Sequence, residues 1–267
     1  MFTIISALLP AAVAPAPLQP NENWTVAYEE SMCLASRSFG ANADVKLLLR
    51  PSPFGDNVEV TFIQSGSPDR RVVRDGKAAL LVSPAGGKFD GSYKAWRSPS
   101  QKGRVVIVYT QAPVLNALTD DSVLTLSAPR EKPVSVSMRH LTKLKPVIED
   151  CKRTVAKHWG VDLNALDRIA VPAEPAADPA SWVRYTDYPD DALRKGQGGV
   201  VTLLWSIGAS GDVKECKVVA SSGVASLDRA GCRAIMSRAR YQPAKDGSGQ
   251  AVPAYGMRRI MWLTSGG

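Results

Sequence analysis

A proline- and alanine-rich segment divides this chain and limits how it can fold. Residues 170–181 read AVPAEPAADPAS. Proline fixes φ and lacks the N–H that helices and sheets need, and the small and acidic residues around it supply little apolar surface. The segment therefore favours an extended spacer over a packed core. With 267 residues, 45% of them apolar, the rest of the chain suffices for two folded domains. We predict an N-terminal domain at 21–165, a linker at 166–183 and a C-terminal domain at 184–267.

The first sixteen residues, MFTIISALLPAAVAPA, contain an apolar run of about twelve residues. This is the length of a signal-peptide core, whereas a bilayer-spanning helix needs about twenty apolar residues. We predict a signal peptide at 1–16, export to the periplasm, and no transmembrane helix in the mature chain. No Lys or Arg precedes the run, so a frayed apolar tail or a start further upstream is the alternative.

The N-terminal domain has the pattern of a β-rich fold. Apolar and β-branched runs alternate with turn signals such as Asp75-Gly76, Gly86-Gly87 and Asp90-Gly91. Short strands at this spacing predict a small antiparallel sandwich or barrel. The predicted strands are Trp24–Tyr28, Val45–Leu49, Val58–Ile63, Val105–Tyr109, Val123–Leu126 and Val134–Met138.

The hydrophobic period changes to that of a helix after residue 140. Apolar residues recur at steps of three and four and form one stripe of an amphipathic helix that would close the domain. The stripe consists of Leu141, Leu144, Ile148, Cys151 and Val155. Cys33 lies in an early element that also begins with apolar residues. In an exported protein we expect Cys33 and Cys151 to form a disulfide; two separate buried thiols are the alternative.

The C-terminal residues suggest a helix, a strand, a glycine hairpin, a second strand, a helix and a last strand. This order resembles the C-terminal domain of TonB-family proteins, over about residues 185–264. The residues that match the family pattern are Tyr188, Pro189, Gly199, Ser222, Gly223, Leu227, Asp228, Pro243 and Ala244. The resemblance implies a three-stranded antiparallel sheet with helices on one face, so the whole chain is predicted to be α+β.

The resemblance also implies a function. Domains of this family bind an extended segment of an outer-membrane receptor by adding it to a sheet edge, and the physical basis is pairing with unpaired N–H and C=O groups. The predicted docking stretch lies after Pro253, which removes one donor. It contains Tyr255, Met257, Arg258, Arg259, Ile260, Met261 and Trp262. Such an edge would also let two copies of the chain pair.

Two further cysteines lie in the C-terminal domain. Cys216 shares a predicted strand face with Val218, and Cys232 lies one turn after Asp228 on the following helix. A sheet–helix interface would bring the two sulfur atoms together, and some domains that resemble this one carry cysteines at these places. We expect a Cys216–Cys232 disulfide; two free buried thiols remain the alternative.

Other functions have less support. A motor-coupled TonB transducer would need a longer apolar anchor and a longer proline-rich linker. His140 and His158 are eighteen residues apart and cannot bind one ion, and no nucleophile, phosphate-loop or zinc pattern is present. We therefore predict no enzyme, no metal and no cofactor. The formal net charge of +8 comes without a dense basic run, so nucleic acid is not expected. Binding of an envelope polymer or anionic surface, or less favourably an enzyme in the N-terminal domain, is the alternative.

Overall fold

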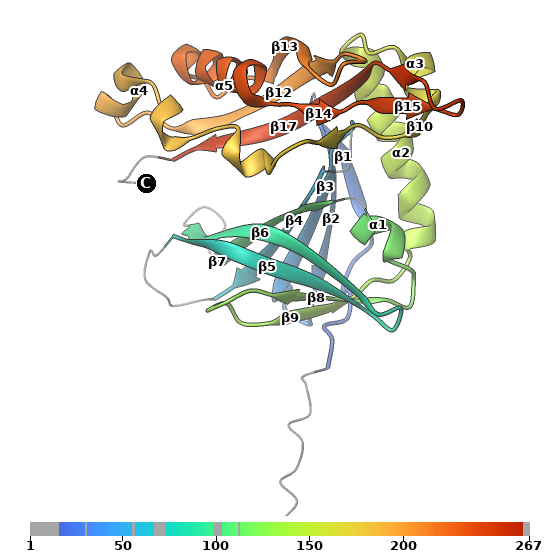
Figure 1. Cartoon of the computed structure of the whole chain (residues 1–267). Helices are drawn as coiled ribbons and strands as arrows, with labels where there is room; N and C mark the ends of the chain where they lie inside the picture. Colours follow the sequence, from blue (N-terminus) through green and yellow to red (C-terminus); the bar gives the residue numbers. More distant parts are fainter. Residues whose placement is uncertain are drawn as a thin grey trace, which may run out of the picture.

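A computed structural model describes residues 16–29, 31–54, 57–66, 73–98, 103–111 and 113–263. The protein is a mixed α/β structure of two layers, each built around a sheet, with helix α2 (Leu141–His158) running alongside both (Figure 1). The predicted signal peptide at 1–16 lies, except for its last residue, outside the described residues. Within the described part, no helix is both long enough and apolar enough to cross a membrane.

The N-terminal layer is one antiparallel sheet of nine strands in the order β1-β2-β3-β4-β7-β6-β5-β8-β9, curved into a half-barrel (Figure 1). Strands β2 and β3 alternate buried side chains with mostly half-buried ones, as expected when one face covers a core. The strands are β1 (Thr25–Tyr28), β2 (Cys33–Phe39), β3 (Val45–Pro51), β4 (Asn57–Ser65), β5 (Arg74–Ser83), β6 (Gly87–Ser98), β7 (Gly103–Gln111), β8 (Val123–Ser127) and β9 (Val134–Ser137).

Of the two predicted architectures, the barrel is closer to this structure than the sandwich, because a single curved sheet, and not two stacked sheets, forms the N-terminal layer. All six predicted strands are present, but the sequence pattern missed β2, β5 and β6. The predicted turns at Asp75-Gly76 and Asp90-Gly91 are wrong, since both pairs lie inside strands. Gly91 is needed there because a Cβ would lie 2.4 Å from the carbonyl oxygen of Tyr109 on β7.

The segment before β1 forms backbone hydrogen bonds with the last strand of this sheet and with the residue that follows β2. The N–H of Leu18 donates to the carbonyl of Ser135 on β9 at 2.8 Å, and the N–H of Ser137 donates back to Leu18 at 3.0 Å. One residue later, the carbonyl of Gln19 accepts from the N–H of Gly40, beyond β2, at 2.9 Å. The backbone of this segment thus bridges the last strand and the end of the second one.

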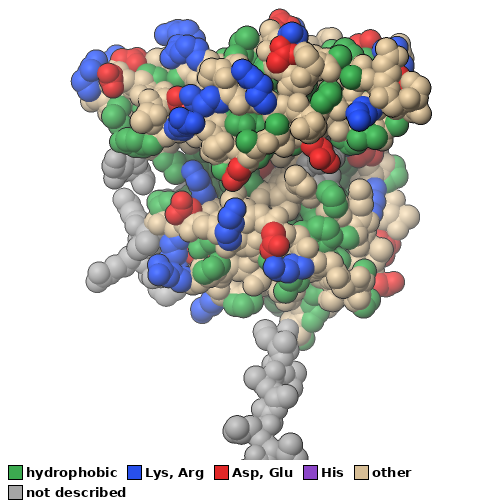
Figure 2. All heavy atoms as spheres, in the orientation of Figure 1, with side chains coloured by type: hydrophobic (Ala, Val, Ile, Leu, Met, Phe, Trp, Pro, Cys, Tyr) green, Lys and Arg blue, Asp and Glu red, His purple; other side chains and the backbone are tan. Residues whose placement is uncertain are grey.

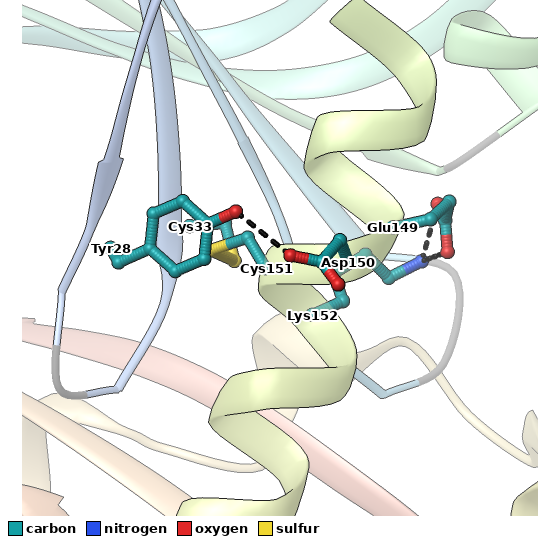
Figure 3. The surroundings of a disulfide bond; sticks show 6 residues. All are labelled: Tyr28, Cys33, Glu149, Asp150, Cys151 and Lys152. Carbon is teal, nitrogen blue, oxygen red and sulfur yellow. Dashed lines mark hydrogen bonds and ion pairs between the residues drawn. A yellow bond between two sulfur atoms is a disulfide. The ribbon is translucent and has the colours of Figure 1, made fainter.

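Helix α2 packs its predicted apolar stripe on the sheet. Leu141, Leu144, Ile148, Cys151 and Val155 are all buried. The predicted Cys33–Cys151 disulfide is confirmed, and it ties β2 to α2 (Figure 3). Beside it, the Tyr28 hydroxyl donates to Asp150 at 3.1 Å. Two short helices flank α2 along the chain: α1 (Pro113–Ala117) and α3 (Leu163–Asp167), the latter N-capped by Asp162.

The proline-rich segment lies extended against the C-terminal residues. It forms β10 (Ile169–Val171), β11 (Glu174–Pro175) and a 3-10 turn η1 (Pro179–Ser181). These strands pair with β15 (Ala244–Asp246) and β14 (Tyr241–Gln242), and β15 also pairs with β16 (Ala251–Val252). Trp182, directly after η1, is buried against Trp205 and Tyr241.

The C-terminal layer contains a three-stranded antiparallel sheet in the order β13-β12-β17. Helix α5 packs on β12 and β13 (Figure 1). The predicted Cys216–Cys232 disulfide is confirmed and joins β13 to α5. The elements are η2 (Tyr185–Asp187), α4 (Asp190–Arg194), β12 (Gly199–Ile207), β13 (Val213–Ala220), α5 (Ala225–Arg238) and β17 (Ala254–Trp262).

The face of this sheet that α5 leaves open packs on the N-terminal part. Leu204, Val219 and Met257 from the sheet form one buried cluster with residues of the N-terminal part and of the segment after α2, which are Met32, Phe54, Ala156 and Val161. The rings of Phe54 and Tyr255 are 5.8 Å apart. Because these apolar side chains come from both layers, their burial holds the layers together.

We expect removal of each disulfide to lower the free energy of unfolding by a different amount. Cys33–Cys151 spans 118 residues and Cys216–Cys232 spans 16. In the chain-entropy model, removing them by Cys→Ala pairs lowers the free energy of unfolding by about 5 and about 3 kcal/mol, respectively. Urea unfolding of the two double variants measures both losses. An equal or reversed order would show that strain or residual unfolded structure, and not loop closure, sets their contributions.

Candidate partner-binding site

Strand β17 lies at an edge of the C-terminal sheet. Residues Ala254–Trp262 pair with β12 along its whole length, from Ile207 to Gly199. Among the described residues no strand pairs with the other edge of β17. All seven residues of the predicted docking stretch lie on this strand. The strand thus offers a row of backbone groups to which an extended segment could add.

The two faces of β17 are covered differently. Ile260 and Trp262 belong to the core below the helices, and Trp262 packs edge-on against Tyr188 with ring centroids 5.3 Å apart. Tyr255 and Met257 face the N-terminal part. Gly256 lies under the indole of Trp205, where a Cβ would come within 2.4 Å of the ring. Both faces are therefore occupied by the protein itself, and the edge is left for a partner.

Arg258 and Arg259 point to opposite faces, as their neighbouring positions in a strand require. The Arg258 guanidinium donates to the carbonyl of Pro179 in η1 at 2.6 Å. The Arg259 guanidinium forms an ion pair with Glu59 on β4 at 2.5 Å. The two side chains therefore attach β17 to the linker segment and to the N-terminal sheet, and both border the same cavity at the free edge of the strand.

A groove follows the edge of β17 where it faces the N-terminal sheet. A cavity of about 660 Å³ lies beside Met257, Arg258 and Arg259, and a second of about 390 Å³ continues to Met261. The opposite walls come from β5, β6 and β7, and η1 borders both cavities. Acidic and basic side chains occur together along the boundary of the two layers (Figure 2). An extended chain in this groove would lie next to the free edge.

The residues of the family pattern mostly hold the fold. The Tyr188 hydroxyl donates to the carbonyl of Gln197 at 2.6 Å, and Leu227 and Ala244 are fully buried. Gly199 leaves room for the carbonyl of Ser222, and Gly223 has a φ of 82°. Pro189 is the N-cap residue of α4, and Pro243 lies between β14 and β15. These positions shape the sheet and its turns and leave β17 at the edge.

Asp228 is a buried carboxylate that fixes the turn before α5. It accepts from the Ser221 hydroxyl at 2.6 Å and from the hydroxyl and N–H of Ser222 at 2.7 and 2.9 Å. Burial alone would raise the pKa of Asp228, but the hydrogen bonds from Ser221 and Ser222 outweigh burial and lower it. The ionised form of Asp228 therefore stabilises the folded state.

Several groove residues have no signal in the sequence. Arg50, Glu59 and Tyr109 belong to the N-terminal sheet and reach the groove only because the two layers pack together. No periodicity links Glu59 to Arg259, which is 200 residues away. Among the described residues, no group of three or more His, Cys, Asp or Glu side chains is arranged to hold a metal ion.

The fold defines the class of the C-terminal part: an α/β domain with helices on one face of a three-stranded sheet, whose edge strands β13 and β17 each have no further strand partner among the described residues. Residues 184–263 match the family described as Gram-negative bacterial TonB protein C-terminal. The predicted resemblance is confirmed, and these residues form a TonB C-terminal domain. No curated protein matches the chain.

The buried carboxylate gives a test of the turn before α5. Asp228→Asn removes a charge and at least one acceptor site, so we expect a loss of about 1–3 kcal/mol in the free energy of unfolding at pH 7. Because the folded pKa of Asp228 is lowered, its contribution is complete above the ordinary value of 3.8 and disappears as pH falls through the folded pKa.

Chemical unfolding from pH 7 down to pH 2 measures this effect. The difference between the wild type and Asp228→Asn should narrow below about pH 4. The exposed Asp121→Asn is the matched control and should change stability little at any pH. A constant difference across the whole range would contradict the role of the ionised carboxylate.

Proposed function

We propose that this protein acts in the periplasm as a TonB-like protein and binds an extended segment of an envelope or outer-membrane receptor protein. The observation that carries the proposal is the free edge of β17 within a TonB C-terminal domain. This family is a non-enzymatic interaction domain, and its members bind proteins such as outer-membrane receptors. The binding mode is strand addition, and the process it serves is TonB-dependent transport across the outer membrane.

The packing of the other surfaces of the C-terminal sheet supports the proposal. Side chains on both faces of β17 pack within the protein, so a partner gains its main contacts from backbone hydrogen bonds. The opposite edge strand, β13, carries exposed charged residues that include Lys214, Glu215 and Lys217. Charged side chains on an edge disfavour strand pairing. The two edges of the sheet therefore differ, and β17 is the one suited to a partner.

Crosslinking in living cells tests the location of the site. A photo-reactive residue at position 261, on β17 beside the groove, should capture a receptor protein. The same residue at position 217, on β13, is the matched control and should give a much lower yield of that product. Equal yields at both positions would contradict binding at the β17 edge.

Peptide titration tests the binding mode. Segments from the periplasmic side of receptors of the same cell should shift the backbone amide NMR signals of residues 251–263, with little change at higher salt. Binding of a polymer or anionic surface would instead weaken strongly with salt and would not depend on peptide sequence. Receptor segments that leave these amide signals unmoved would rule out strand addition at β17.

A further inference from the structure

The larger cavity beside β17 brings together three arginines from distant parts of the chain. Arg50 comes from the end of β3, and Arg258 and Arg259 are consecutive on β17. Their side chains are largely shielded from solvent, and Arg50 exposes 13% of its side-chain surface and Arg259 21%. Guanidinium groups that border one cavity and are partly buried require negative charge nearby.

The protein supplies only part of that charge. Glu59 is shared, because one of its oxygens lies 2.5 Å from Arg259 and 3.4 Å from Arg50. Glu29 lies 3.5 Å from Arg50 at the outer side and is itself 42% exposed. The Arg258 guanidinium donates to a neutral carbonyl, that of Pro179. The Nε of Arg50 is buried and has no hydrogen-bond partner among the described residues.

Other charged groups also border the cavity, and one of them, Asp178, interacts electrostatically with Arg258. Lys77 adds a further cation, and Asp90 and Asp178 add carboxylates. Asp90 already pairs with Lys88 at 3.0 Å. Tyr109 stands among Glu59 and the three arginines, and burial together with Glu59 raises its pKa to about 12. At neutral pH its hydroxyl therefore keeps its proton and can donate a hydrogen bond. Hydrogen-bond donors thus prevail around Tyr109.

We propose that Arg50, Arg258 and Arg259 form a carboxylate-binding site, and that it takes an aspartate or glutamate side chain of the segment that pairs with β17. This inference rests on the proposed function, because the cavity lies along the free strand edge. Side chains of an added strand alternate between its two faces, so every second one would point toward the N-terminal sheet. A carboxylate fits the planar guanidinium donors and compensates the buried charge.

Matched peptides test the site on the full-length protein. The probes are acetylated, amidated hexapeptides, Thr-Val-Glu-Val-Thr-Val and its twin with Gln in place of Glu. We expect the Glu peptide to bind about 10- to 100-fold tighter and to shift the side-chain Nε–H NMR signals of Arg50 and Arg258. The Gln peptide with a free C-terminus shows whether a terminal carboxylate serves equally well.

Variants separate the charge effect from loss of fold. Arg258→Gln and, independently, Arg50→Gln should reduce the Glu-to-Gln preference to about unity. The exposed Arg233→Gln on α5 is the matched control and should leave the preference intact. The amide signals of β17 report in each variant whether the strand is still formed.

The outcomes distinguish this inference from the proposed function. Equal affinity for the two amidated peptides, with β17 amides shifting in both titrations, would overturn the carboxylate site and leave strand addition standing. Preference for the free C-terminus over the Glu side chain would overturn the assignment to a side chain. Failure of both amidated peptides to shift any β17 amide would overturn the inference, while receptor segments would still decide the proposed function.

Discussion

The position of the edge strand β17 and the groove beside it depend on the contact between the N-terminal and C-terminal layers. The face of the C-terminal sheet opposite α5 is apolar, and Met32 and Phe54 of the N-terminal part bury it together with Ala156 on α2. The ion pair between Glu59 and Arg259 lies beside this apolar cluster. Hydrophobic burial has no preferred direction, whereas an ion pair favours one relative position of the two layers. The same contact sets the distance between β17 and the N-terminal strands, and so creates the groove.

The two parts of the chain contribute different walls to the groove. The TonB C-terminal domain supplies the free strand edge, and the N-terminal sheet supplies a second wall for whatever lies along it. Backbone pairing alone recognises almost any extended chain, whereas a wall with charged groups distinguishes one side chain from another. In the proposed binding mode, the N-terminal half-barrel would therefore add selectivity to strand addition.

Much of the fold could be predicted from the sequence because local patterns encode it. The stripe from Leu141 to Val155 predicts both α2 and the burial of Cys151, and the alternation in β3 marks a strand with one buried face. Strands β5 and β6 were missed because Gly76 and Gly91, ordinarily turn residues, lie inside them, Gly91 for close backbone approach. The groove could not be predicted. Packing between distant segments brings Glu59, Arg50 and Tyr109 close to β17. Such contacts produce no periodic pattern in the sequence.

The two disulfides have a consequence for how the chain can fold as it emerges. Their loops do not interleave: the bridge from Cys33 to Cys151 is complete before Cys216 and Cys232 begin. A chain that appears N-terminal end first can therefore oxidise its first pair when no other cysteine is present to compete. Cys216 and Cys232 then have only each other left to pair with. Order of appearance along the chain is enough to select the native pairing from the three that four cysteines allow.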